Sequence, residues 1–541
     1  MHLKINGATE YETSVIDSLN YSKIHKDFAS VKFELDSVQK ILYKKGFIEN
    51  ELANLEKVDD STFNAQFLLK NKFNTIYIYY NKEDIDVSTL KFISKNVFDN
   101  YFELKFTDIE NGLKYINAKF SEKGFPFSKL RLSNIRLTDD VNLEAELTTE
   151  SSEQKRIINN IVIKGYEKFP KSYVKRYLKI KPSQVFNLKK VQNKTEQLNN
   201  LNFANEVKPP EVLFLKDSTI LYLYLEKTKS NAFDGFLGFG TNEDTNKLEF
   251  DGYLNLNLTN NLNYGESFRL LYKSDENDQK TFEVDMSLPY LFKSPVGIDL
   301  LLRIFKRDSS FTTTNQSAKL HYQINAKHKV FAGLVSTESN NLLTQNFSPN
   351  IADFKTQHFN VAYQFLRPQS NNLLFPLKTK FYLETSFGNR KSSRDTERQS
   401  QFVIDAFKIF SLNKKNSMYF RLNGASLVSK NYFENELFRF GGINSIRGFE
   451  ENSLFSNLYG LINTEYRYQL NNYIFIHSII DAAYFENKLI NTKEKLFGYG
   501  FGFGILTKAG LFRFNYANGK VENSTFNISN SKIHLSLTTN F

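Results

Sequence analysis

The sequence predicts a multidomain chain in which tandem α+β domains precede an antiparallel transmembrane β-barrel of about sixteen strands. Three observations predict this fold class. The first 228 residues repeat one order of helix and strand patterns, whereas the remainder alternates apolar with polar residues in segment after segment. Aromatic residues make up 15% of the chain, with 52 Phe and 29 Tyr, which is enough to coat a large lipid-facing surface.

The N-terminal region repeats a strand-helix-helix-strand-strand order about every 75 residues. The clearest copy has strands at 157–163, 205–214 and 219–226 and helices at 172–178 and 188–200. The middle copy has strands at 75–80, 130–137 and 142–148 and helices at 90–98 and 108–123. The first copy shows strands at 3–6, 48–57 and 63–69 but only one helix, at 35–45. We therefore predict domains at 1–74, 75–152 and 153–228, the first being the least regular.

From about residue 229 onward the pattern has a period of two. In 247–257, Leu248, Phe250, Leu254 and Leu256 alternate with polar residues, and the same alternation recurs at 281–288, 359–365 and 461–470. A soluble β-sandwich also alternates, but Phe or Tyr at nearly every apolar position favours lipid contact. The segments centre near residues 234, 248, 268, 282, 298, 320, 330, 359, 381, 402, 420, 461, 474, 499, 512 and 533. An even count of about sixteen closes a membrane barrel over 229–541 without an exposed edge.

Composition excludes several other classes of protein. The net charge of +11 is spread over Lys-rich loops without a dense basic block, which favours a solvated surface over nucleic-acid binding. The absence of Cys and the spacing of His321 and His328 predict no metal site, and no motif calls for a cofactor. No apolar run is long enough for a spanning helix. Met1 is not followed by a signal peptide, so we expect the chain to be cytosolic or to have lost its signal before residue 1.

One loop, at about 438–453, has an unusual composition. It places Arg447 between the pair Gly441 and Gly442 and the single residue Gly448. Glycines allow the backbone to turn tightly, and the missing side chain at Gly448 lets the guanidinium approach a facing wall and bind a carboxylate bidentately. We therefore predict a loop folded back into a polar interior, although an Arg-Gly-Phe tripeptide alone is usually a surface turn.

Two predicted strands are rich in glycine. In 497–504 glycines alternate strictly with aromatic residues, whereas a phosphate-binding loop places its glycines in a turn that opens a helix. We expect an inner wall cleared of side chains, against which the Arg447 loop packs; its glycines are Gly498, Gly500, Gly502 and Gly504. The first barrel strand carries Gly235, Gly238 and Gly240, which predicts a weak seam with the last strand.

These features together resemble the Omp85 superfamily, in which POTRA domains precede a transmembrane barrel, as in its BamA/TamA-like members. The motif Ile446-Arg447-Gly448-Phe449 matches the family's lid-loop motif, and five predicted strands follow it. The strand at 463–467 resembles the family's Glu-Tyr-Arg strand. The next strand, at 479–483, resembles its Phe-x-Asp-x-Gly motif, with Ile479 and Ala483 as departures. The alternating last strand ends on Phe541 and resembles an outer-membrane β-signal.

Strand parity places two carboxylates on the inner wall. Glu465 lies on the same side of its strand as Asn463 and Arg467, and Asp481 on the same side as His477. We therefore expect Arg447 to bridge Glu465 and Asp481 and to lock the lid loop to the wall. The alternative is that each charge is separately solvated in a wet pore. Removal of Arg447 is expected to be more damaging than removal of Arg467.

The resemblance implies an assembly factor in the outer membrane of a Gram-negative bacterium, with its POTRA domains in the periplasm. Such a protein captures unfolded β-barrel clients and inserts them through the seam between the first and last strands; its partners are the bilayer, the clients and accessory periplasmic subunits. An enzyme is not expected, because Gly424-Ala425-Ser426-Leu427-Val428 lacks the second glycine of a Gly-x-Ser-x-Gly elbow. Two-partner-type polypeptide secretion, lipid transfer with a periplasm-spanning partner, and a passive porin remain alternatives. Three repeats without a plug helix favour the assembly factor.

Overall fold

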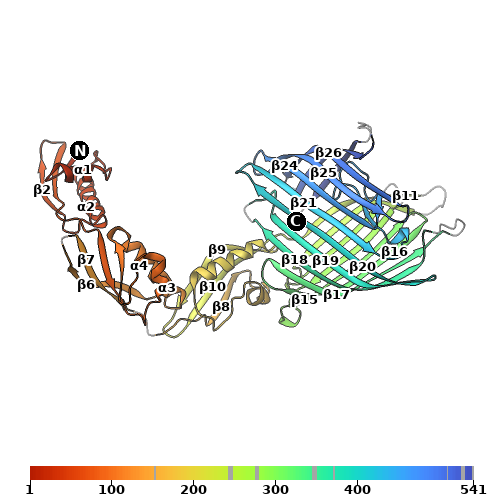
Figure 1. The fold of residues 1–541 in the computed structure, drawn as a ribbon, viewed down its shortest axis with the longest axis horizontal. Helices are drawn as coiled ribbons and strands as arrows, with labels where there is room; N and C mark the ends of the chain where they lie inside the picture. The colour runs from red at the N-terminus through yellow and green to blue at the C-terminus, as the bar shows by residue number, and fades with distance from the viewer. Residues whose placement is uncertain are drawn as a thin grey trace. The chain divides into compact units, whose positions relative to one another are not determined.

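The computed structural model describes residues 1–139, 141–150, 154–241, 248–274, 279–343, 350–369, 372–507, 510–524 and 531–538. The chain forms two compact units. The first contains Met1–Asn159 with the short segments Pro182–Lys190 and Phe214–Thr219, and the second contains the remaining residues. Figure 1 labels the elements of both units. Among the described residues, no helix is both long enough and apolar enough to cross a membrane.

The first repeat contains the full strand-helix-helix-strand-strand order. Its elements are β1 (His2–Gly7), α1 (Glu10–Asp17), α2 (Phe28–Lys44), β2 (Glu51–Lys57) and β3 (Thr62–Leu68), with sheet order β1-β3-β2. The prediction of a single helix was wrong, because α1 was missed. Its signal is a capping box: the Thr9 side chain accepts a hydrogen bond from the Glu12 amide, and the Glu12 side chain accepts one from the Thr9 amide.

The second repeat adds a strand to this order. Its elements are β4 (Thr75–Tyr79), α3 (Val87–Ile93), β5 (Tyr101–Lys105), α4 (Ile109–Glu122), β6 (Lys129–Leu137) and β7 (Asn142–Glu150), with sheet order β5-β4-β7-β6. The helix predicted at 90–98 is shorter and starts earlier. The extra strand β5 was not predicted; it pairs antiparallel with β4 and buries Phe102 and Leu104.

The third repeat follows the predicted order. It contains β8 (Asn160–Gly165), a short irregular helix (Tyr173–Tyr177), α5 (Leu188–Thr195), β9 (Ala204–Phe214) and β10 (Thr219–Lys227), with sheet order β8-β10-β9. The irregular helix reaches the first turns of the barrel. The buried Tyr173 hydroxyl donates to the Gly265 carbonyl at 3.1 Å, and its ring packs edge-on against Tyr290 at 5.0 Å.

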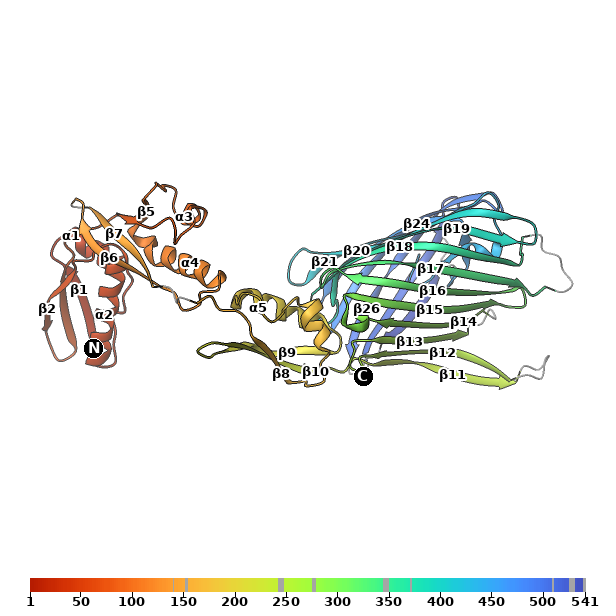
Figure 2. The same ribbon diagram turned by 90° about the horizontal axis from the view of Figure 1, so that it is seen from below.

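The C-terminal region is a sixteen-stranded antiparallel sheet, and each of its strands contains one of the predicted segments. Figures 1 and 2 show the strands tilted and side by side in chain order. They are β11 (Ala232–Thr241), β12 (Leu248–Thr259), β13 (Ser267–Ser274), β14 (Gln279–Leu288), β15 (Val296–Arg307), β16 (Phe311–Gln323), β17 (His328–Asn341), β18 (Phe354–Pro368), β19 (Leu377–Ser392), β20 (Thr396–Ser411), β21 (Asn416–Val428), β24 (Leu458–Gln469), β25 (Ile474–Asn487), β26 (Thr492–Thr507), β27 (Gly510–Val521) and β28 (Ser531–Thr538).

The two faces of the barrel wall differ in polarity, as the alternation predicts. In β18 the inward residues His358 and Asn360 are buried, whereas Phe359 between them is 53% exposed on the outer face. The same rule holds in β26, where Tyr499 and Phe501 face outward. In these two strands the inward positions are polar or glycine and the outward positions are aromatic, as a lipid-facing barrel requires.

The sheet has two ends within the described part of the chain. Ladder pairing runs from β11 through each neighbour to β28, and no ladder among the described residues joins β28 back to β11. Gly235, Gly238 and Gly240 all lie in β11, where they pair with β12 residues. The first and last strands thus lie at the least connected position of the wall.

Candidate functional site

The lid loop connects β21 to β24 and contains a short ribbon of β22 (Phe438–Phe440) and β23 (Leu454–Ser456). Gly441 and Gly442 have φ values of 110° and 95°, which are left-handed conformations that favour glycine. The Gly442 amide donates to the Ile446 carbonyl at 3.1 Å and closes the turn. Ile446 is completely buried in an apolar cluster with Phe440 and residues of the wall. This burial directs the loop into the barrel.

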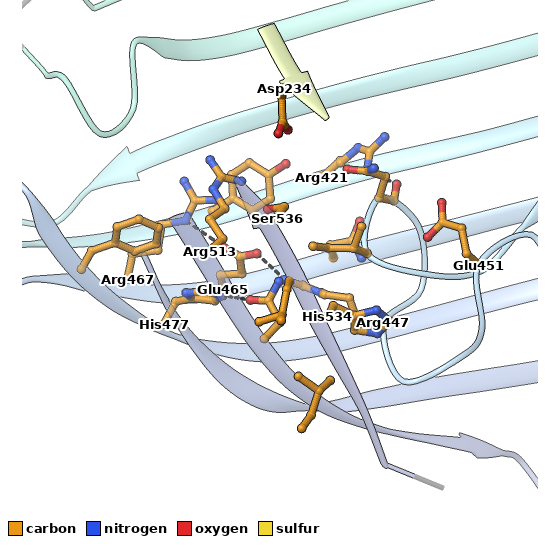
Figure 3. A pocket seen from close by; sticks show the side chains of 18 of the residues that line it. Asp234, Arg421, Arg447, Glu451, Glu465, Arg467, His477, Arg513, His534 and Ser536 are labelled. Carbon is orange, nitrogen blue, oxygen red and sulfur yellow. Dashed lines mark hydrogen bonds and ion pairs between the residues drawn. The ribbon is translucent and has the colours of Figure 1, made fainter. Parts of the chain in front are cut away.

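Arg447 bridges the two inward carboxylates, Glu465 and Asp481; Figure 3 shows its contact with Glu465. Its Nε and Nη2 donate to Asp481 Oδ2 and Oδ1 at 2.8 and 2.6 Å, and its Nη1 donates to Glu465 Oε1 at 2.5 Å. The Arg447 amide also donates to Asp481, at 3.1 Å. Arg447 is only 4% exposed and Asp481 only 1%. All three guanidinium nitrogens are therefore satisfied in a site with almost no solvent contact.

A second arginine shares this site. Arg467 Nε donates to Glu465 Oε2 at 2.7 Å, and its guanidinium stacks over the rings of Tyr419 and Phe375, 4.0 and 4.6 Å from their centroids. Arg467 holds the same carboxylate and is nearly as buried, but it makes one side-chain hydrogen bond to a carboxylate where Arg447 makes three, so the expected contrast between the two arginines stays a prediction. Glu465 and Arg467 are two residues apart on β24, so their side chains point to the same face of the strand and the sequence already placed them side by side.

The lid backbone touches part of the predicted glycine wall. A Cβ atom added at Gly498 would lie 2.4 Å from the Arg447 carbonyl oxygen, and one at Gly519 would lie 2.4 Å from the Gly448 carbonyl oxygen. Gly519 on β27 was not among the predicted residues. Gly500 faces the β27 backbone, Gly502 faces Asn515 and His477, and Gly504 faces Phe475. The loop thus packs on Gly498 and Gly519, whereas the other three glycines accommodate the wall's own residues.

The last strand also contacts the lid. The Gly448 amide donates to His534 Nε2 at 3.3 Å, and Lys532 forms an ion pair with Glu450 at 2.8 Å. Phe449 is partly buried against the lid's apolar cluster. Phe541 lies outside the described residues. The lid is therefore held by β24 and β25 on one side and touches β28, the strand at the seam.

A cavity of about 720 Å³ lies beside the lid inside the barrel. It is lined by side chains of the lid, of β24 and β25, and of both seam strands, including Asp234 on β11 and Ser536 on β28 (Figure 3). Arg421 and Arg513 also line it and were not predicted. Arg421 donates to Asp405 at 2.8 Å and to the Asn444 carbonyl at 2.6 Å, so it ties the lid tip to β21.

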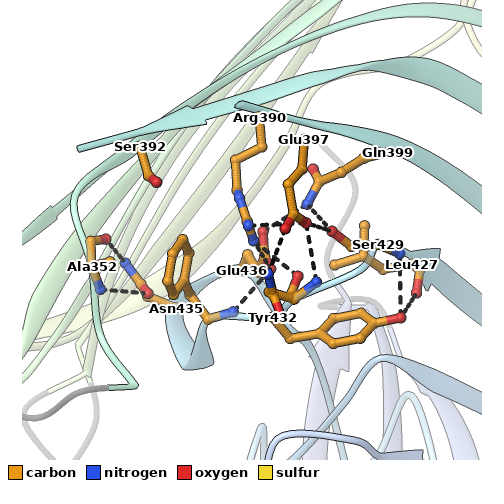
Figure 4. Close-up of polar contacts among 12 residues, drawn as sticks. Ala352, Arg390, Ser392, Glu397, Gln399, Leu427, Ser429, Tyr432, Asn435 and Glu436 are labelled. Atoms are coloured by element: carbon orange, nitrogen blue, oxygen red, sulfur yellow. Dashed lines mark hydrogen bonds and ion pairs between the residues drawn. The ribbon is translucent and has the colours of Figure 1, made fainter. Parts of the chain in front are cut away.

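The base of the lid has a separate buried anchor that sequence patterns did not indicate (Figure 4). Arg390 on β19 is fully buried, forms ion pairs with Glu436 at 2.6 Å and Glu397 at 3.2 Å, and stacks over Phe433, 4.2 Å from the ring centroid. Asn435 Nδ2 donates to Ser339 Oγ on β17 and to the Ala352 carbonyl just before β18, both at 2.8 Å. The partners are far apart in the sequence, which explains why no local motif revealed them.

In the described ranges, no group of three or more metal-binding side chains is arranged to hold an ion. The arrangement around Arg447 binds and positions the lid through charge and hydrogen bonds. These contacts hold the lid loop inside the barrel, next to the seam between β11 and β28.

Comparison with known proteins agrees with this architecture. The POTRA family, described as a surface antigen variable number repeat, matches residues 157–227, and the Omp85 superfamily domain matches residues 253–541. No curated protein matches the sequence.

Three solved structures share the fold at low identity. BamA from Haemophilus ducreyi lacking POTRA domains 1-3 is 14% identical with a TM-score of 0.53, over 86% of this chain and 99% of that one. CdiB from Acinetobacter baumannii is 15% identical with a TM-score of 0.54, over 96% and 100%. CdiB from Escherichia coli is 14% identical with a TM-score of 0.55, over 93% and 98%. Because the superfamily domain alone matches more than half of the residues, the chain belongs to the Omp85 superfamily.

Proposed function

We propose that this protein is an outer-membrane assembly factor that captures unfolded β-barrel clients through periplasmic POTRA domains and inserts them at the seam between β11 and β28. Membership of the Omp85 superfamily implies an outer-membrane barrel that acts on protein clients. The proposal adds the class of client, the side of the membrane and the route of insertion. It includes no bond-making chemistry.

The state of the seam is the observation that carries the proposal. Neighbouring strands elsewhere in the wall pair along 8 to 15 residues, for example Ser267–Ser274 on β13 and Phe354–Pro368 on β18. In the described ranges no such ladder closes β28 on β11. Opening this seam therefore sacrifices few backbone hydrogen bonds, and each exposed edge is a template for a client strand. The glycines of β11 support this, because they provide no side chains for cross-strand packing.

The lid has a supporting part in this proposal. Arg447 holds the loop against β24 and β25, while Gly448 and Glu450 contact β28 through His534 and Lys532. We propose that this contact keeps the C-terminal side of the seam in place while the β11 side moves. Loss of the Arg447 anchor would free β28 as well as the loop.

Polypeptide export through the lumen is the second candidate. The polar cavity beside the lid favours it, because an extended chain needs a wet passage once the lid has moved. Export requires the lid to leave its buried anchor in every cycle, which costs several kcal/mol. Insertion at the seam leaves the anchor intact, and this difference makes insertion the first choice.

Depletion of the protein followed by outer-membrane proteomics and lipid analysis separates the candidates in the cell. Broad loss of β-barrel proteins is expected for the assembly factor. Loss of one secreted protein would instead identify an exporter, and altered lipid with intact barrels would identify lipid transfer. Large, steady conductance without any assembly defect would identify a porin and overturn the proposal.

A cross-linked seam tests the route directly. The chain has no cysteine, so the double variant Asp234→Cys and Ser536→Cys can be joined across the cavity by a short bis-maleimide. Insertion of an unfolded barrel client into proteoliposomes should then stop. The matched control joins Leu270→Cys to Val284→Cys, which are register partners within the paired β13–β14 ladder, and should insert normally. Normal insertion with the seam closed would exclude this route.

A further inference from the structure

The cavity beside the lid is lined by five cationic side chains, and the protein neutralises only some of them. Arg421, Arg447 and Arg467 each hold a carboxylate of the protein, at 2.5 to 2.8 Å. The other two, Lys273 and Arg513, form no hydrogen bond or ion pair with a described residue. The cavity therefore contains cations that are available to a ligand.

Arg513 on β27 is surrounded by space rather than by partners. Its side chain is exposed in the lumen and points into the cavity (Figure 3). Its register partner on β26 is Gly504, which has no side chain to supply a counter-charge. Its register partner on β28 is Ser536, which lines the same cavity. A guanidinium with all its N–H donors free thus lies beside a hydroxyl group.

Arg467 lies beside Arg513 and leaves part of its own guanidinium free (Figure 3). Its Nε donates to Glu465 at 2.7 Å, and neither Nη1 nor Nη2 donates to a described residue. The two positive charges repel each other unless an anion lies between them. Glu465 is already shared with Arg447, and Asp234, which also lines the cavity, forms no ion pair with a described residue. The two arginines are therefore one anion short.

The arginines lie beside the seam, towards the end of the barrel where the chain enters from the third repeat. β11 and β27 run in the same direction, because neighbouring strands are antiparallel and an even number of steps separates these two in the sheet. Asp234 and Arg513 are the third and fourth residues of their strands, so both lie near that end. Strand ends of a spanning barrel lie at the level of the lipid headgroups. A headgroup at this level faces the least connected part of the wall.

We infer that Arg513 and Arg467, with Ser536 beside them, form a binding site for a phosphate group, either on a lipid headgroup or free in solution. A guanidinium binds two phosphate oxygens at once, so one phosphate bridges both arginines and also accepts from the serine hydroxyl. A carboxylate has two oxygens and a single charge, and one arginine is enough to satisfy it. The cavity volume of about 720 Å³ is that of an ordinary ligand site. The site does not depend on the proposed function, because a bound phosphate neither requires nor excludes a client.

Titration of the full chain in a maltoside detergent tests the inference. The probes are inorganic phosphate and the soluble lipid dihexanoyl phosphatidylglycerol, at constant ionic strength, and calorimetry measures binding. The wild-type protein should bind at least one of them. Arg513→Gln should weaken this binding about tenfold or more, because it removes charge-assisted hydrogen bonds. Arg513→Lys keeps the charge but loses the planar fork, so its affinity should fall in between.

The matched control is Arg303→Gln on β15. Arg303 is another inward cation, 45% exposed, and lines a separate cavity of about 440 Å³. Its loss should leave phosphate binding unchanged. Equal weakening by Arg303→Gln and Arg513→Gln would mean that phosphate responds only to the overall charge of the lumen, which overturns the site.

Thermal unfolding separates a binding arginine from a structural one. Arg513 holds no carboxylate of the described chain, so Arg513→Gln should unfold in phosphate-free buffer at the wild-type temperature or above it. Added phosphate should raise the unfolding temperature of the wild type and not that of the variant. A variant that is less stable than the wild type without ligand would show that Arg513 supports the barrel itself, and would overturn the inference.

The two phosphate probes distinguish the two sources. Tighter binding of the lipid than of inorganic phosphate assigns the site to a headgroup, whereas equal or weaker binding of the lipid assigns it to free phosphate. A capped peptide of alternating Asp and Gly is the third probe. If this peptide binds more tightly than either phosphate, the cavity takes a polypeptide carboxylate and the phosphate assignment is wrong. Binding of neither phosphate probe to the wild type overturns the inference.

Discussion

The tip and the base of the lid are each held by one buried arginine, but the two anchors are built in opposite ways. At the tip the arginine belongs to the loop, and Arg447 binds carboxylates of the wall. At the base the arginine belongs to the wall, and Arg390 binds Glu436 of the loop and Glu397 of β20. The lid is therefore fixed at two positions, with the charges exchanged between loop and wall.

The hydrogen bonds of the two arginines differ in quality. All three guanidinium nitrogens of Arg447 donate to carboxylates. Only Nη1 of Arg390 donates, and its Nε and Nη2 have no hydrogen-bond partner among the described residues. A buried charge is costly unless it is fully bonded. We therefore expect the tip to be the stronger of the two anchors.

The largest effect is expected from Arg447→Ala. It leaves Glu465 with Arg467 as its remaining partner and strands the buried Asp481, so the barrel should lose about 3–5 kcal/mol. The temperature at which the folded band disappears in heat-modifiability gels measures this loss. Arg447→Lys, which retains the charge but cannot form the bidentate bond, should fall in between. Wild-type behaviour of both variants would mean that the tip is not an anchor.

Arg390→Ala should cost less, about 2–3 kcal/mol, because Arg390 makes fewer hydrogen bonds to lose. Its effect should be confined to the base. Limited proteolysis should cut the segment 429–437, while a spin label near the tip keeps the mobility seen in the wild type. A larger loss of stability than in Arg447→Ala would reverse the ranking of the two anchors.

Gly498→Ala tests the close approach of lid and wall. The added methyl group would lie 2.4 Å from the Arg447 carbonyl oxygen, so lid or wall must shift, at a cost of about 1–3 kcal/mol. The matched control is Gly460→Ala on β24, where a Cβ atom meets nothing within 4 Å. Both variants are compared by heat modifiability. A difference indistinguishable from zero would show that the lid does not rest on this glycine.

Glu436→Gln should lower the stability of the barrel by about 1 kcal/mol or less. Burial disfavours the charged form of the Glu436 carboxyl and raises its pKa, which offsets much of the stabilisation that Arg390 gives to the carboxylate. Glu436 lies in the loop, outside the spanning strands. A raised pKa means that the folded state binds the proton more tightly, so this contribution to stability declines as pH rises above 4.5. The variant should lose that part of the pH dependence in melts at several pH values. If the variant and the wild type have the same pH profile, Glu436 does not contribute to the pH dependence of stability.

The smallest effect is expected from Lys532→Ala. Its ion pair with Glu450 is exposed, at 41% and 59% for the two side chains, so it contributes about 0–1 kcal/mol and is screened by salt. Heat modifiability in low and high salt should differ slightly in the wild type and not in the variant. A loss of stability as large as that of Arg390→Ala would mean that the contact between the lid and β28 stabilises the barrel more than its exposure predicts.

Local patterns were sufficient for most of the architecture. The alternation of residues such as those of β14 or β18 places each strand and its inward face, because a side-chain period of two fixes the orientation of every residue once one is known. The position of Asp481 opposite Arg447 followed from that parity and from the family motif. The sequence patterns missed two short elements, α1 and β5. The only local signal for α1 is the capping box at Thr9, and β5 is only five residues long.

The sequence by itself determined the strand count, the inward and outward faces and the identity of the lid motif, since each is encoded within a few neighbouring residues. The tertiary structure alone decided which groups meet across long separations. Arg390 reaches Glu436 from another strand, and Gly519 on β27 joins Gly498 under the lid. Burial and strand pairing depend on which distant residues the fold brings nearby, and the local alternation of residues carries no information about those residues.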